Sequence, residues 1–338
     1  MAVTASVPGR IFVGGDHATL LGGPRIAGAL DLRLRVTVTE RDDDRVVVSG
    51  PLGRRDTTLD ALLESTDTSA VLTVSKSGRR LPVYTLLRRL LRTIGRDDPA
   101  DIPGFGIEID VDDAFPVGVG LASSTATTVA LTAALADTFG DRRSDREVID
   151  LVTAVEDDLY EDAVAIDPAV IVSGGLVVGE STVTDRTTAD LPVLVAATET
   201  RPSRAEIRSQ VERRRTITGP LYDDVRAASD ATTDRLWAHI TDGDRAEMRE
   251  LITFYGELLD ALGFSSWPMP RLRSTELLQH PHDLGVKQSD FGKRATLVTF
   301  PDAGSDTAEL ERILGRTAEH VVATTTTDRG LEYGTPSR

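Results

Sequence analysis

The stretch that decides how this sequence is interpreted is Pro116-Val117-Gly118-Val119-Gly120-Leu121-Ala122-Ser123-Ser124-Thr125-Ala126. It follows an alternating segment typical of a strand and runs into the apolar, helix-forming residues Thr127–Ala136. Small residues let a backbone approach a ligand closely, and the free N–H groups of a helix's first turn attract anions. The stretch therefore predicts a phosphate-binding loop, with an ordinary glycine-rich loop and a serine N-cap as the alternative. It matches neither the GxxxxGK[ST] loop nor the dinucleotide fingerprint.

Hydrophobic periodicity around this loop predicts a mixture of strands and helices in the first half of the chain. Ser144 and Glu147 have the spacing of a capping box, which marks the start of a helix. A hairpin is expected over Ala169–Gly179, around its Gly-Gly pair. The expected strands are 11–13, 30–39, 45–49, 70–75 and 105–111, and the expected helices are 81–94, 127–136 and 144–158.

The order of elements changes after about residue 180. One strand is expected at 191–197, and the next part is mainly helical over 204–215, 219–241 and 244–262. Two strands at 295–300 and 320–325 enclose a helix at 307–314. No internal repeat or low-complexity linker divides the chain, so this change alone places a domain boundary near residue 185. We predict domains of residues 1–185 and 186–338.

The composition excludes several classes of function. The chain has 338 residues and a formal net charge of −16, which disfavours binding to nucleic acid or to an anionic membrane. It has no run of 18 apolar residues, no basic-then-apolar leader and no cysteine, so we expect neither a membrane span nor disulfides, and a cytoplasmic location. Only three of its 38 basic residues are lysines, and with abundant acidic residues this indicates adaptation to high salt.

Three motifs resemble those of the GHMP kinase superfamily and occur in that family's order. The loop at 116–124 is similar to PxGxGLGSSAA, and residues 8–24 (PGRIFVGGDHATLLGGP) are similar to the substrate motif PGKxxxxGEHxxxxG. Residues 166–175 (IDPAVIVSGG) resemble the mevalonate kinase segment in which an Asp lies seven residues before a Gly-Gly pair. The resemblance covers nearly the whole chain, and it is greatest to archaeal-type mevalonate kinases. It implies a two-domain α+β fold, with an N-terminal half like domain 2 of ribosomal protein S5 and a ferredoxin-like C-terminal half.

The resemblance also implies a kinase that uses ATP and Mg²⁺ to phosphorylate a hydroxyl of a small hydroxy acid, with mevalonate as the favoured acceptor. ATP would lie at the phosphate loop and the acceptor in the cleft between the domains. The residues implied to contact ATP are Pro116, Gly118, Gly120, Leu121, Ala122, Ser123, Ser124 and Thr125.

Asp167 is implied as the general base that takes the proton of the acceptor hydroxyl. Arg10 replaces a family lysine; it keeps the positive charge but cannot exchange protons. Asp16 and His17 replace the family's Glu-His pair on the substrate side. The alternatives are that Asp167 caps a turn before Pro168 and that His17 is a polar residue of a turn.

Two residues are implied as Mg²⁺ ligands, Ser124 of the loop and Glu156, eleven residues before Asp167. Hydroxyl and carboxylate oxygens suit this hard cation. The alternative for Glu156 is a solvated acidic helix end, since Asp157 and Asp158 follow it.

The third motif of the superfamily, KxxGAGGGG, is eroded here to residues 285–297 (GVKQSDFGKRATL). Lys293 and Arg294 could supply charge to a phosphate, or be exposed basic residues before a strand. This stretch also resembles the Asp-x-Gly-Pro-Asn segment of mevalonate-phosphate decarboxylases. Asp290 is therefore the alternative catalytic residue, for phosphorylation of a tertiary hydroxyl followed by decarboxylation or for a 3-kinase. A catalytically inactive relative that serves as a binding protein is the alternative of another class, and a homodimer is kept open.

Overall fold

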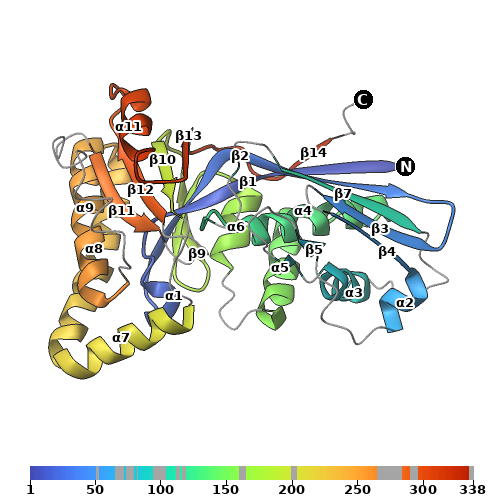
Figure 1. Cartoon of the computed structure of the whole chain (residues 1–338), viewed down its shortest axis with the longest axis horizontal. Coiled ribbons are helices and arrows are strands. Elements are labelled where there is room, and N and C mark those ends of the chain that lie inside the picture. Colours follow the sequence, from blue (N-terminus) through green and yellow to red (C-terminus); the bar gives the residue numbers. More distant parts are fainter. Residues whose placement is uncertain are drawn as a thin grey trace.

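The computed structural model describes the chain of 338 residues with the exception of residues 51–52, 65–71, 74–79, 82, 94–103, 112–114, 116–118, 160–164, 199–203, 265–283, 290–295 and 335–338. The described part is an elongated molecule with two main sheets and a small two-stranded ladder, and its two longest strands run between its two ends (Figure 1).

The larger sheet forms the N-terminal half. Its main path has the order β14-β1-β2-β7-β3-β4, and β8 pairs with β2 and with β9. The pairings are antiparallel except that of β3 with β7. The strands are β1 (Ala2–Gly14), β2 (Arg25–Glu40), β3 (Arg45–Gly50), β4 (Gly53–Thr58), β7 (Phe105–Val111), β8 (Leu176–Gly179), β9 (Val183–Thr187) and β14 (Glu332–Gly334).

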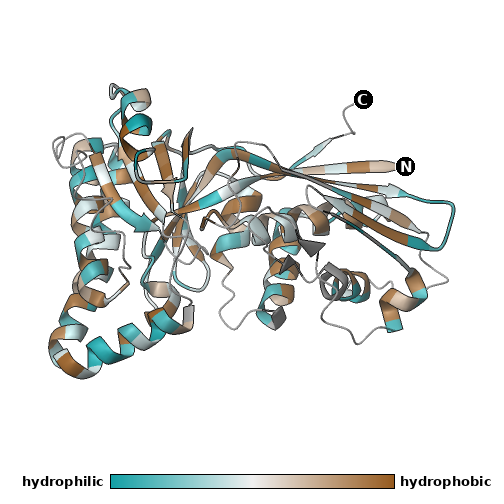
Figure 2. Cartoon of the chain, viewed as in Figure 1, coloured by the Kyte–Doolittle hydropathy of each residue, from teal (hydrophilic) through white to brown (hydrophobic). Residues whose placement is uncertain are grey.

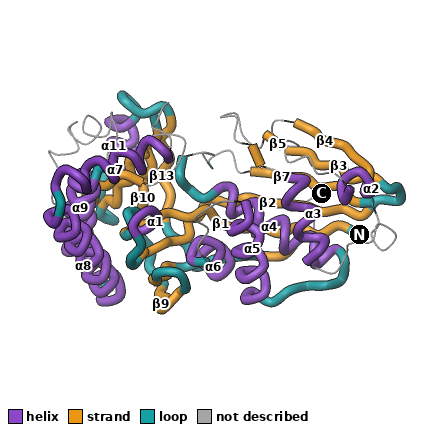
Figure 3. Tube along the Cα trace, turned by 90° about the horizontal axis from the view of Figure 1, so that it is seen from below, coloured by secondary structure: helices purple, strands orange, loops and turns teal. Residues whose placement is uncertain are grey.

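Helices gather beneath this sheet in the view of Figure 1, and Figure 3 shows them from below. The central one, α4, is buried on nearly every side, and four of its five threonines donate their hydroxyls to carbonyls one turn earlier. This explains how a helix without a polar face lies in the core. The elements here are α2 (Leu59–Glu64), α3 (Val83–Thr93), α4 (Ser123–Thr138), α5 (Asp145–Leu159) and α6 (Ile166–Ser173), with a small ladder of β5 (Leu72–Thr73) and β6 (Arg80–Leu81). The short helix α1 (Ala18–Leu21) lies apart from them and packs against the helices of the C-terminal half (Figure 1).

The C-terminal half is built on a four-stranded antiparallel sheet with the order β11-β12-β10-β13. The expected ferredoxin-like arrangement is confirmed, because two β-α-β units interleave in that order. Figure 2 shows α7 as largely hydrophilic, whereas the strands are mostly apolar. The elements are β10 (Pro192–Ala197), β11 (Leu284–Ser289), β12 (Thr296–Pro301), β13 (His320–Thr325), α7 (Arg204–Thr218), α8 (Pro220–Asp242), α9 (Arg245–Leu262) and α11 (Thr307–Leu314).

The strands β1 and β2 contribute to the cores of both halves. Val7 and Phe12 lie in the core under the large sheet, whereas Ile11 and Val13 pack with Val195 and other residues of the second sheet. After the C-terminal sheet, the chain returns to the larger sheet, where β14 pairs with β1. The division at residue 185 stays a prediction.

Most of the expected elements agree with the structure, and the capping box is confirmed by hydrogen bonds between Ser144 and Glu147 in both directions. The hairpin expected over Ala169–Gly179 is wrong. Its first half is helix α6, and the left-handed Gly174 and Gly175 end that helix before β8 begins. The strand expected at 11–13 is the end of the much longer β1. None of the described helices is both long enough and apolar enough to cross a bilayer.

Substitution Gly15→Ala tests the tight turn after β1. Gly15 has φ +82°, and a Cβ atom there would lie 2.2 Å from the carbonyl oxygen of Pro24. Strain and clash together should lower the free energy of unfolding by at least about 2 kcal/mol, measured by chemical denaturation. Gly140→Ala is the control, because Gly140 has φ +72° but open space around it. Equal losses in the two variants would contradict this account.

Candidate active site

The two residues predicted as catalytic, Arg10 and Asp167, form an ion pair. Arg10 lies on β1 and donates from Nη2 to Oδ2 of Asp167, in the first turn of α6. Both side chains are largely buried, with 9% and 18% of their areas exposed. The apolar residues of α6 place Asp167 because they pack into the core and orient the helix's first turn toward β1. Asp167 is therefore paired across the site, and its expected alternative as the cap of a turn does not describe it.

The second oxygen of Asp167 remains available. Oδ1 is buried and accepts no hydrogen bond from the described part of the chain, and Nε of Arg10 is buried without a partner there as well. The guanidinium also lies over the ring of Phe12, 3.7 Å from its centroid, which restricts its position further. The pair thus presents one fixed, charged oxygen that can accept a proton.

The backbone of Arg10 touches the phosphate loop. Its N–H donates to the carbonyl of Leu121 at 3.1 Å, and Thr296 of β12 donates from Oγ1 to the carbonyl of Val119 at 3.0 Å. Ala122 takes the left-handed conformation with φ +54°, which glycine would adopt without strain. Helix α4 then begins at Ser123, so its free N–H groups lie where the loop ends.

Glu156 is not a solvated helix end. It is 5% exposed within α5, whereas the next residue, Asp157, is exposed. Thr125 donates from Oγ1 to Oε2 of Glu156 at 3.3 Å, so the carboxylate lies beside the first turn of α4. The sequence suggested this position only through the resemblance. Among the described residues no group of three His, Cys, Asp or Glu residues could hold a metal ion on its own.

Asp16 and His17 lie in a buried network instead of on an open surface. Oδ2 of Asp16 accepts from Nζ of Lys287 at 2.7 Å, with side chains 2% and 0% exposed. The ring of His17 lies between Tyr255 and Asp230, and it is 0% exposed. The sequence interpretation missed Lys287, Tyr255 and Asp230, although the scarcity of lysine was a usable signal for the first. The substrate-side role of Asp16 and His17 stays a prediction.

Several predicted residues lie outside the described part of the chain. These are Pro116 and Gly118 of the loop and, from the third motif, Asp290, Lys293 and Arg294. The start of that motif is described: residues 284–289 form β11, a fully buried strand.

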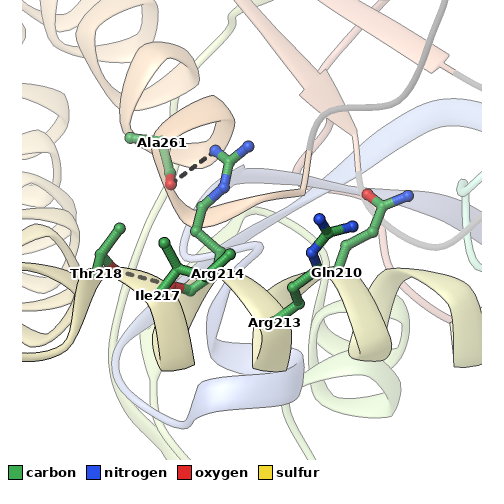
Figure 4. A pocket seen from close by; sticks show the side chains of 6 residues that line it. All are labelled: Gln210, Arg213, Arg214, Ile217, Thr218 and Ala261. Atoms are coloured by element: carbon green, nitrogen blue, oxygen red, sulfur yellow. Dashed lines mark hydrogen bonds between the residues drawn. The ribbon is translucent and has the colours of Figure 1, made fainter.

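A separate cavity of about 660 Å³ lies between α7 and the end of α9 (Figure 4). Arg214 crosses it to donate to the carbonyls of Asp260 and Ala261, at the C-terminal end of α9. Its described lining residues are Gln210, Arg213, Arg214, Ile217, Thr218 and Ala261, and none of the predicted site residues is among them.

Comparison with known proteins agrees with this geometry. Residues 82–175 match the family model of the GHMP kinases N terminal domain. The chain carries a GHMP kinase N-terminal domain. The mevalonate kinase of Thermococcus onnurineus is 26% identical over 338 residues, which is 98% of each chain. The mevalonate kinase of Methanothermobacter thermautotrophicus is 29% identical over 272 residues, 79% of this chain and 80% of the relative.

Solved structures show the same fold as this chain. A mevalonate kinase crystal structure superposes with a TM-score of 0.78 at 16% identity, covering 96% of this chain and 99% of the other. The mevalonate kinase of Methanococcus jannaschii superposes with a TM-score of 0.76 at 17% identity, covering 96% and 98%. The expected superfamily and fold are confirmed, and the family and relatives together indicate an ATP-dependent small-molecule kinase.

Substitution Arg10→Met tests the buried pair. Removing the guanidinium leaves the carboxylate of Asp167 without its counter-charge, so the free energy of unfolding should fall by about 3 kcal/mol. Adding Asp167→Asn should recover part of this loss. The control is Arg41→Met, because the Arg41–Asp43 pair is exposed and should contribute less than about 1 kcal/mol. Similar losses in both single variants would show that burial of the first pair has no energetic consequence.

Proposed function

We propose that this protein transfers the γ-phosphoryl group of ATP to a hydroxyl of mevalonate, and that it does so through the residues described above. The observation that carries the proposal is the buried Arg10–Asp167 pair. Arg10 lies on β1, which is hydrogen-bonded to the phosphate loop, and Oδ1 of Asp167 in α6 has no hydrogen-bond partner among the described residues. The named relatives, several of them mevalonate kinases covering most of the chain, support the choice of acceptor.

The phosphate side is formed by the loop and the start of α4. Residues 120–125 place the first turn of the helix at the end of the loop, where unpaired N–H groups and the helix dipole stabilise negative charge. The hydroxyls of Ser123 and Thr125 are in this turn and are largely buried. We assign ATP phosphate binding to this turn.

The acceptor side is formed by Asp167 and Arg10. As the acceptor oxygen forms its bond to the γ-phosphorus, the bond between that phosphorus and the bridging oxygen of ADP breaks. Oδ1 of Asp167 takes the proton of the hydroxyl, and Arg10 keeps the carboxylate in place through Oδ2. Because arginine stays protonated, Arg10 supplies only charge and position, and Asp167 alone moves the proton.

The residues present also fit Mg²⁺. Glu156 and the hydroxyl of Ser124 would hold it, because both offer hard oxygen atoms. Ser124 is in the first turn of α4, and Glu156 of α5 lies beside that turn. Two protein ligands suffice, because this ion usually takes its other ligands from phosphates and water. When bound, Mg²⁺ neutralises charge that develops on the β- and γ-phosphates.

The proposal is tested by a coupled ADP-release assay with MgATP at high KCl. Mevalonate, its 3- and 5-phosphates, its diphosphate, pantoate, shikimate, homoserine and galactose would be the acceptors, with product mass and CO₂ followed. Phosphomevalonate without CO₂ is the expected result. Release of CO₂ would overturn it in favour of decarboxylation through Asp290, and nucleotide binding without turnover on any acceptor would favour an inactive relative.

Substitution Asp167→Asn should remove the base while preserving the shape of the side chain. We expect kcat to fall by at least about 100-fold, the contribution typical of a positioned acid or base. ATP affinity, measured by equilibrium binding, should stay within about twofold, because the phosphate turn is unchanged. A variant that retains most of its kcat would exclude Asp167 as the base.

Substitution Glu156→Gln should weaken the response to Mg²⁺. Losing the carboxylate removes a charged ligand, so the Mg²⁺ concentration for half-maximal rate should rise by about tenfold. Asp157→Asn is the matched control, since Asp157 is adjacent but exposed. If both variants shift the Mg²⁺ dependence equally, overall charge and not coordination explains the effect.

A further inference from the structure

Lys287 is a fully buried lysine in a chain that has only three. It lies on β11, and its Nζ donates to Oδ2 of Asp16 at 2.7 Å and to the carbonyl of Gln288 at 3.2 Å. The ammonium and the carboxylate come from opposite ends of the sequence and meet where the turn after β1 contacts the C-terminal sheet. This ion pair therefore links the N-terminal half of the molecule to the C-terminal half.

Stability alone does not explain such a pair. Taking two charges out of water costs about as much as their attraction returns, and apolar residues of similar volume often serve as well. What a buried pair does provide is a defined geometry, because each charge accepts only a partner in the right place. We therefore asked what Lys287 and Asp16 hold in position.

The turn that contains Asp16 is held from two further helices. The N–H of His17 donates to the hydroxyl oxygen of Tyr255 at 3.3 Å, and that hydroxyl lies 2.7 Å from Nδ1. The network assigns the tautomer: Tyr255 donates to Nδ1, and Nε2–H donates to Asp230 at 2.8 Å. The turn is thus oriented by β11, α9 and α8 together.

Helix α9 and β11 act as one unit in this contact. A Cβ atom on Gly256 would lie 2.9 Å from the carbonyl of Val286 and 3.2 Å from Cα of Lys287. The helix and the strand therefore pack backbone against backbone at the residue whose side chain reaches Asp16.

We propose that Lys287 is a positioning residue that fixes the Gly15–Leu21 turn relative to Asp167 without touching either substrate. The turn continues directly from β1, which carries Arg10, so a shift at Asp16 moves the acceptor side and leaves the phosphate turn of α4 in place. The proposal rests on the proposed function only in naming that turn as the acceptor side.

The test compares Lys287→Met with Thr253→Val in the full chain. Thr253 joins α9 to β11 by hydrogen bonds with Leu284 and Val286, at 3.3 and 3.1 Å, and these two bonds do not involve the turn. Two readouts are taken for each variant: the KM values for mevalonate and for ATP, and hydrogen exchange of the amides at 14–22 and 121–138. The exchange readout does not require catalysis, so failure of the proposed function is recognised separately, as an inactive wild type.

For Lys287→Met we expect at least a tenfold rise in the KM for mevalonate, an ATP KM within twofold, and faster exchange at 14–22 only. Thr253→Val should change neither KM by more than twofold. Adding Asp16→Asn to Lys287→Met removes the carboxylate that has lost the ammonium of Lys287, and it should restore protection at 14–22. This double variant carries the test if the single variant does not fold. Unchanged exchange at 14–22, or equal effects of Lys287→Met and Thr253→Val, would overturn the proposal.

Discussion

The hydrogen bond from the N–H of Arg10 to the carbonyl of Leu121 joins the two chemical halves of the site. Arg10 of β1 thus contacts the phosphate loop with its backbone, while its side chain pairs with Asp167. The same strand then ends in the turn that carries Asp16. Because β1 is paired with β2 over nearly its whole length, the distances among these groups are set by one strand and not by independent loops.

Two buried ion pairs lie along this segment, and they differ in what they connect. Arg10–Asp167 is contained within the N-terminal half, whereas Asp16–Lys287 spans both halves. A charge that has left water interacts strongly over short distances and tolerates little displacement. Placing one such pair at the reaction centre and another at the interface of the halves makes the catalytic geometry sensitive to how the halves are packed.

Elements whose pattern follows from local burial could be predicted from the sequence. Periodicity identified β7 and α11 with the observed bounds, because each buries one clear face. It recovered only the end of β1, since the register shift at Pro8–Gly9 and the small residues before it obscure the alternation. It mistook α6 for a strand because a short apolar run with β-branched residues has no polar face to reveal its period. The motifs identified Asp167 and Arg10. No local pattern predicts the ion pair of Lys287, because only the tertiary fold brings Asp16 next to it.

The pairing of Thr4 with Gly334 has a consequence for how this protein is made. The first strand leaves the ribosome early, yet its outer edge is covered only when β14 has been synthesised. Until then the large sheet presents an open row of peptide groups, which is the kind of surface that recruits strands from other molecules. The contacts between β14 and β1 therefore join residues that are far apart in the sequence. Because such contacts form slowly, we expect the last step of folding to be slow and to depend on the pairing of β14, a strand of three residues.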